Sequence, residues 1–264
     1  MGQSQYKSRA ELKYLARAQM SGRFGLLIGA VLIPALISFF VTQLSSVVSV
    51  TSAAGYTVNY VIAFIIQIIL SVMQVGASLI YLKSACSMPS QMNDLLHGYK
   101  NNLTDALKLG FLFTLIDSIC LIPCDIMNMQ LLNTTDLMLP EITESTTINE
   151  MMEFYNIYYS ILMSYYSLAI CCILAAFLIK LVFMPAYYLM LDFPDRSVMS
   201  ILKTSAEVMR GNKLRYLTLQ ISFIPLLLLS MLTCGIALIW VLPYMHMTSA
   251  NFYLDIMAVR NHNI

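Results

Sequence analysis

The chain has 264 residues, of which 59% are hydrophobic and only 11% are charged. A soluble domain carries roughly 25% charged residues, and a protein of this size could not cover itself with so few. The composition therefore excludes an ordinary soluble protein and predicts an all-α, polytopic membrane helix bundle. The formal net charge is +1, so the distribution of charge along the chain is more informative than its total.

Apolar runs of about 20 residues predict the membrane spans, since a helix of that length crosses the hydrocarbon core. A charged amphipathic helix is expected before the first run, at 8–21, and another before the fifth, at 196–210. The last span is the most polar, and residues 233–235 supply a tight turn before it. We expect a single membrane domain over 1–264 with about six spans, at 24–44, 59–82, 108–126, 160–189, 216–232 and 236–256.

Basic residues alternate with segments that carry none. The N-terminal tail, the loop after the second span and the segment after the fourth span are basic. Residues 43–58 carry no charge, and residues 127–157 carry acidic residues but no Lys or Arg. Because Lys and Arg favour cytoplasmic loops, both termini are predicted to lie in the cytoplasm, with 127–157 as an outer loop.

One unit occurs twice: an amphipathic helix, a glycine corner and an apolar run. Gly22 and Gly211 occupy the two corners, where glycine lets the chain turn into the membrane. Residues 93–113 form a third, degenerate copy with Gly98 as its corner. We expect the helices to lie in the headgroup plane and to contact anionic lipid through Arg9, Lys13, Arg17, Arg23, Lys203, Arg210, Lys213 and Arg215.

Asp117 and His246 are the ionisable residues that come closest to the predicted midplane of their spans. A charge at the bilayer centre is costly, so such residues form either a proton-relay or ligand site or a polar clamp between two helices. A hydrogen bond between Asp117 and His246 is our hypothesis for them. Lys180 and Asp255 form a second candidate pair, with a structural role.

Two further groups of residues each have a structural and a functional interpretation. Cys120 and Cys124 lie four apart and are a candidate disulfide, although cysteines in apolar runs usually behave as small hydrophobes. Asp192, Pro194 and Asp195 predict a turn and a helix N-cap, with a divalent metal site as the remote alternative.

No catalytic or nucleotide-binding motif is present. The chain has no phosphate-binding glycine loop, no G-x-S-x-G and no HExxH, so we expect no enzyme, no cofactor and no metal site. The basic residues are divided among membrane-flanking segments, which argues against nucleic-acid binding. The first hypothesis is a non-enzymatic membrane module that binds lipid or a partner membrane protein. The alternatives are a small transporter or channel subunit that uses Asp117 and His246, and, in third place, a lipid-headgroup enzyme.

The segment 209–256 contains an M-x-G-N-K corner, an L-x-I-S-F start of the span, a G-I-x-L-x-W-x-x-P-Y run and a closing F-Y pair. These motifs resemble the bacterial integral membrane family called domain of unknown function 975, strongly over about 181–257 and weakly over 10–40. The corner unit is remotely similar to the membrane region of some glycerophosphodiester phosphodiesterases. The resemblance implies a multi-pass protein of the bacterial cell membrane and carries no established activity.

Overall fold

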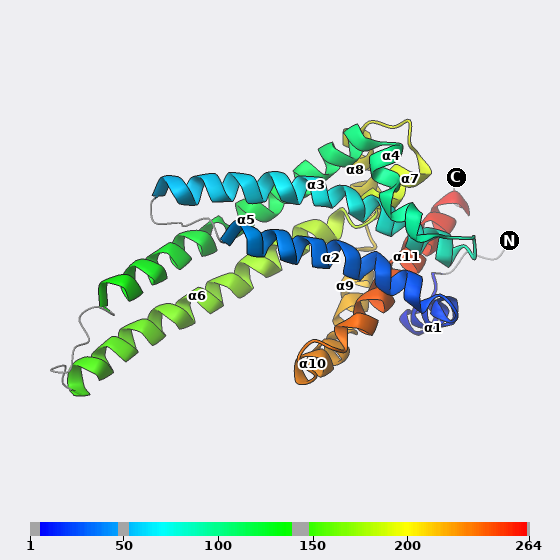
Figure 1. Ribbon diagram of the computed structural model, residues 1–264. Coiled ribbons are helices and arrows are strands. Elements are labelled where there is room, and N and C mark those ends of the chain that lie inside the picture. The colour runs from blue at the N-terminus through cyan, green and yellow to red at the C-terminus, as the bar shows by residue number, and fades with distance from the viewer. Residues whose placement is uncertain (1–5, 47–52, 139–147, 263–264) are drawn as a thin grey trace. The chain divides into compact units, whose positions relative to one another are not determined.

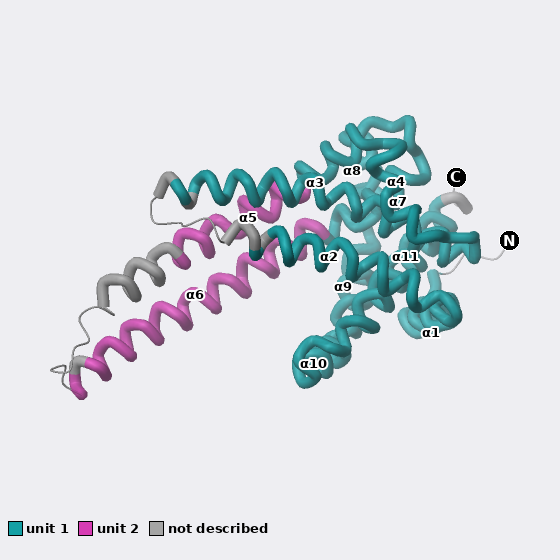
Figure 2. The backbone as a smooth tube through the Cα atoms, in the orientation of Figure 1, with its two compact units in different colours: residues 1–112, 181–264 teal, residues 113–180 magenta. Residues whose placement is uncertain are grey.

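The computed structural model describes residues 6–46, 53–138 and 148–262, and every regular element within these ranges is a helix (Figure 1). This confirms the predicted all-α fold. The chain divides into two compact units, which Figure 2 distinguishes by colour. Unit 1 consists of residues 1–112 and 181–264, and unit 2 consists of residues 113–180.

Unit 1 contains most of the helices. Its N-terminal part comprises α1 (Arg9–Met20), α2 (Phe24–Ser46), α3 (Ala53–Ala85), the short 3-10 helix η1 (Met92–Leu96), α4 (His97–Lys100) and the start of α5 (Leu103–Met138). Its C-terminal part comprises α7 (Ala186–Asp192), α8 (Val198–Val208), α9 (Lys213–Ile221), α10 (Ile224–Leu232) and α11 (Leu238–His262). Unit 2 is a pair of long helices, the rest of α5 and nearly all of α6 (Ile148–Val182).

Five stretches of the described helices are long and apolar enough to cross a membrane, which supports a multi-pass membrane protein. They are Phe24–Val41, Thr57–Ala85, Leu103–Asn128, Met151–Asp192 and Lys213–Leu232. The predicted sixth span, 236–256, falls on α11, which is more polar and is not among these five stretches, so the sixth span stays a prediction.

Helix α11 has a different environment from a lipid-facing span. It contacts α1, α2, α3, α8 and α10, and its residues Met247, Ala250, Phe252 and Tyr253 are completely buried. Its polar side chains bond to protein: Asn251 Nδ2 donates to Gln19 Oε1 at 2.6 Å, and the Tyr253 hydroxyl donates to Asp192 Oδ2 at 2.5 Å. The polarity of α11 thus reflects its place at the centre of unit 1.

The predicted outer loop, 127–157, is also shorter than expected. Helix α5 continues to Met138 and α6 already begins at Ile148, so only 139–147, which the structure does not describe, separates them. Hydropathy marks where the apolar stretch ends, but a helix can continue beyond it into polar sequence. At its other end, the fourth predicted span (160–189) is interrupted after Val182, before α7.

The glycine corners at Gly22 and Gly211 are confirmed. Their φ angles are 79° and 85°, a left-handed conformation that other residues adopt only with strain. The predicted turn at 233–235 is also confirmed, since Cys234 and Gly235 both have positive φ. Gly98 is not a corner: it lies in α4, where a Cβ atom would stand 2.8 Å from the Val72 carbonyl oxygen. Close helix packing, and not a turn, explains that glycine.

Candidate functional site

Helix α1 is a well-capped amphipathic helix. The Ser8 hydroxyl accepts from the Glu11 amide at 3.2 Å, and the Glu11 carboxylate accepts from the Ser8 amide at 2.6 Å. The second of these bonds is the main reason that the pKa of Glu11 lies below its usual value, since it favours the charged form. The apolar residues Leu12, Ala16 and Met20 are buried. The start and face of α1 are therefore fixed by its own sequence.

The apolar face of α1 meets protein. Leu12 belongs to the same hydrophobic core as Val208 of α8, Tyr216 of α9 and Phe252 of α11. Helix α8 buries Val198, Ile201, Ser205 and Val208 in the same way, and Ser205 Oγ donates to the Val182 carbonyl at 3.2 Å. The amphipathic pattern that suggested helices embedded in the headgroup plane is thus accounted for by packing inside unit 1.

What these helices expose is their basic side. Of the eight predicted lipid-contacting residues, five are exposed, and their side chains form no hydrogen bond or ion pair with any described residue. They are Arg9 and Arg17 on α1, Lys203 on α8, Arg210 beside Gly211, and Lys213 at the start of α9. Figure 1 shows α1, α4, α7, α8 and the C-terminal part of α11 at the same end of unit 1, while α2 and α3 extend away from it. We call this the basic end of unit 1.

The other three predicted lipid contacts have protein partners. Lys13 Nζ donates to the Ser222 carbonyl at 2.8 Å and lies 4.0 Å from the centroid of the Phe223 ring. Burial, followed by repulsion from Arg17 and Arg9, lowers the pKa of Lys13. Arg23 donates to the Met88 carbonyl at 3.0 Å. These side chains hold the helices to their neighbours, which sequence spacing alone did not reveal.

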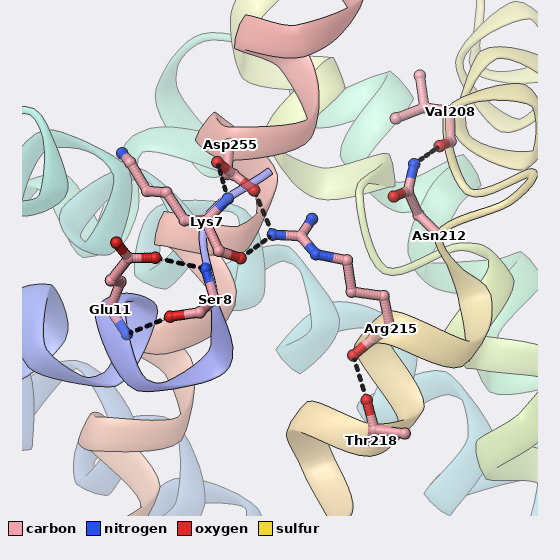
Figure 3. Close-up of polar contacts among 8 residues, drawn as sticks. All are labelled: Lys7, Ser8, Glu11, Val208, Asn212, Arg215, Thr218 and Asp255. Carbon is pink, nitrogen blue, oxygen red and sulfur yellow. Dashed lines mark hydrogen bonds and ion pairs between the residues drawn. The ribbon is translucent and has the colours of Figure 1, made fainter. Parts of the chain in front are cut away.

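Arg215, the third of them, forms the most buried ion pair of unit 1 (Figure 3). Its Nη2 donates to Asp255 Oδ2 and, at 2.7 Å, to the Lys7 carbonyl. The Lys7 amide donates to the other carboxylate oxygen of Asp255 at 3.2 Å. The side chains of Arg215 and Asp255 are only 20% and 5% exposed. The cluster joins the N-terminal segment, α9 and α11 at the second glycine corner.

Aromatic rings complete this cluster. The guanidinium carbon of Arg215 lies 4.6 Å from the centroid of Tyr6 and 4.9 Å from that of Phe252. Nη1 of Arg215 is buried and has no hydrogen-bond partner among the described residues. The sequence offered no signal for this arrangement, because nothing in the spacing of residues 6, 215 and 255 links them.

The two residues predicted near the midplane each have a partner within their own unit. In unit 2, Lys180 Nζ donates to Asp117 Oδ2 at 2.6 Å, and the two side chains are 41% and 35% exposed. In unit 1, the His246 ring stacks on Tyr81 at a centroid distance of 5.3 Å. Lys180 and Asp255 lie in different units, and each has another partner within its own unit, so their candidate pair stays a prediction. A contact between Asp117 and His246 stays a prediction.

A hollow of about 320 Å³ opens beside the second corner, within unit 1. The end of α8, the corner and the end of α11 supply its wall through Glu207, Arg210, Asn212 and Arg260, and Tyr6 closes one side. Arg260 Nη2 lies 3.7 Å from Glu207 Oε2, which is a long ion pair. A larger hollow, of about 610 Å³, is almost entirely apolar and lies where Ile68, Phe111 and Val198 approach one another.

The described residues include no group of three or more His, Cys, Asp and Glu side chains that could hold a metal ion. Asp192 accepts from Tyr253, and Ser197, not Asp192 or Asp195, caps α8. Cys120 and Cys124 are free thiols, and Cys124 interacts instead with the Cys172 thiol on α6. The N-cap of α8 is therefore Ser197 and not the predicted aspartates, and the free thiols agree with the interpretation of Cys120 and Cys124 as small hydrophobic residues.

The comparisons with known proteins support one assignment. The family described as protein of unknown function (DUF975) matches residues 1–260, so the chain belongs to that family. No curated protein and no solved structure gave a significant match. The expected family is thus confirmed, whereas the remote likeness to phosphodiesterase membrane regions stays a resemblance.

Proposed function

We propose that this member of the DUF975 family is a non-enzymatic membrane module whose basic end binds anionic lipid. The supporting observation is that five basic side chains are exposed there, while the apolar faces of α1 and α8 are already buried against protein. Each exposed Lys or Arg near an anionic membrane surface contributes about 1 kcal/mol of attraction. Binding by these helices therefore depends on charge more than on insertion.

The contacts at the ends of the chain favour a particular orientation. Lys7 and Asp255 are 248 residues apart in sequence but directly hydrogen-bonded, so the start of the described chain and the C-terminal part of α11 lie at the same end of unit 1. Helix α11 runs from the turn at 233–235 back to that end, inside the protein. We infer that both termini lie in the cytoplasm of a bacterial cell, where the basic end faces the negatively charged leaflet.

The experiment compares three proteins in phospholipid discs that contain a trace of fluorescent phosphatidylglycerol. Arg9→Gln/Arg17→Gln removes two exposed charges, and the matched control Arg9→Lys/Arg17→Lys keeps them. We expect the Gln variant to release the labelled lipid at lower salt than the wild-type protein, and the Lys variant to behave like the wild type. Equal retention in all three proteins would contradict the proposal.

A second candidate function is favoured by the Asp117–Lys180 ion pair. Both residues lie in apolar helices of unit 2, where charged groups are expensive and mark ion or substrate pathways. A small transporter or channel subunit would use Asp117 and, in unit 1, His246. In that case Asp117→Asn abolishes flux into proteoliposomes without unfolding the protein. A variant that transports as well as the wild type would remove this candidate.

The first hypothesis also included a module that binds a partner membrane protein. The tip formed by α10 and the following turn exposes Leu228, Met231, Leu232 and Ile236. In a lipid environment such residues need no partner, so the basic end carries more weight in assigning the function.

A further inference from the structure

The hollow beside the second corner combines positive charge with a restricted volume. Its volume of about 320 Å³ lies at the low end of the range of small-molecule sites, roughly 300–1,000 Å³. It is too small for a long acyl chain together with its headgroup but adequate for a headgroup alone. Val208, Ile256 and Val259 form the apolar part of its wall.

The charges around the hollow favour an anion. Arg210 and Arg260 line it together with a single acidic residue, Glu207. Arg260 is only loosely paired with Glu207, at 3.7 Å, and the exposed Arg210 has no partner among the described residues. One guanidinium is therefore unpaired and a second is weakly held. The nearby Arg215 and Asp255 neutralise each other and do not change this balance.

Neutral hydrogen-bonding groups also reach the hollow. Asn212 is 93% buried, and its Nδ2 donates to the Val208 carbonyl at 3.1 Å, which fixes the amide in place. The Tyr6 ring, which also lines the hollow, lies 4.6 Å from the guanidinium carbon of Arg215. Guanidinium groups bind phosphate through paired, parallel N–H···O bonds, and two of them approaching one hollow suit a group that carries several oxygens.

We propose that this hollow binds a phosphate group, between Arg210 and Arg260, either from a phospholipid headgroup or from a soluble phosphate ester. If the phosphate belongs to a phospholipid, the inference rests on the proposed lipid-binding function. If it belongs to a soluble ester, the inference is independent of that function. On binding, Arg260 exchanges its long contact with Glu207 for the phosphate oxygens. Glu207 thus competes with the ligand, and its carboxylate weakens binding.

The experiment uses the full-length protein in dodecyl maltoside micelles, which contain no phosphate. One arm titrates glycerol 3-phosphate, and the other titrates phosphatidic acid, with diacylglycerol as the lipid that lacks only the phosphate. Arg210→Gln is expected to weaken binding about tenfold or more, since a hydrogen bond to a charged group is worth at least that much. Glu207→Gln is expected to tighten binding. A misfolded variant would not show this increase in affinity.

Arg196→Gln is the matched control, because it makes the same change at an exposed arginine that does not line the hollow. Binding of phosphatidic acid alone supports a lipid source, and comparable binding of glycerol 3-phosphate supports a soluble one. The inference is overturned if neither ligand binds, if Glu207→Gln does not tighten binding, or if Arg196→Gln weakens binding as much as Arg210→Gln. In the last case the basic end still attracts anionic lipid, and the proposed function stands.

Discussion

Arg215 and Asp255 form a buried ion pair that holds the second glycine corner to α11 and to the N-terminal segment. Asp255 is 5% exposed, so either residue without the other would leave an uncompensated charge inside unit 1. Through Arg215, α9 also bonds directly to the backbone of residue 7.

Asp255→Asn is expected to lower the free energy of unfolding by about 3 kcal/mol, because it leaves the buried Arg215 charge without a partner. The double variant Arg215→Met/Asp255→Leu, which removes both charges, is expected to lose less than the sum of its single changes. Thermal unfolding in detergent measures both effects. A loss in Asp255→Asn no larger than that in the surface variant Lys203→Gln would show that the pair does not stabilise the fold.

Gly76→Ala tests the packing of η1 against α3. A Cβ atom at residue 76 would stand 1.9 Å from the Leu95 carbonyl oxygen, which is backbone and cannot rotate away. We expect the substitution to destabilise the protein by about 1–3 kcal/mol, as overpacking does. The matched control is Gly25→Ala in α2, where nothing lies within 4 Å of the added atom. The packing is not as described if both variants unfold at the same temperature.

Gly211→Ala tests the second corner by conformation alone, since its Cβ atom would meet nothing within 4 Å. At a φ angle of 85° an alanine is strained by about 1–2 kcal/mol, and asparagine, which tolerates the left-handed region, by less. The expected order of unfolding temperatures is therefore wild type, Gly211→Asn and then Gly211→Ala. Gly22→Ala should follow the same rule at φ 79°. An alanine variant as stable as the wild type would contradict the corner geometry.

The thiols of Cys124 and Cys172 provide a test of unit 2. Both side chains are buried, and they interact across α5 and α6. Copper-phenanthroline is expected to join them in an intramolecular disulfide, detected as the loss of two thiols in mass spectrometry after denaturation. Cys124→Ser should prevent this loss, whereas Cys171→Ser, which changes an exposed neighbour, should not. Cross-linking that persists in Cys124→Ser would mean that α5 and α6 pair differently.

The parts of the fold that depend on local sequence were predictable. Ser8 and Glu11 have the spacing of a capping box, and Gly22, Gly211 and Gly235 mark the tight corners through their backbone freedom. The apolar runs predicted the five spans that the structure supports. These signals come from neighbouring residues and do not depend on the tertiary arrangement.

The partners of the charged residues were not predictable. Three basic residues have neighbours in the sequence like those of a residue at a membrane surface, but each bonds to a residue far away in the chain. They are Lys13, Arg215 and Lys180. Likewise, the polarity of α11 is compatible with either a poor span or a helix surrounded by protein. Only the packing around Phe252 and Asp255 distinguishes these two possibilities.

The most direct test of the central claim is mass spectrometry of the lipids that remain bound when the protein is extracted from its native membrane. The wild-type protein is predicted to retain anionic phospholipid above its proportion in that membrane. The variant Arg9→Gln/Arg17→Gln is predicted to lose this enrichment, while Arg9→Lys/Arg17→Lys keeps it. Retained lipid that matches the bulk membrane in all three proteins would contradict a lipid-binding basic end.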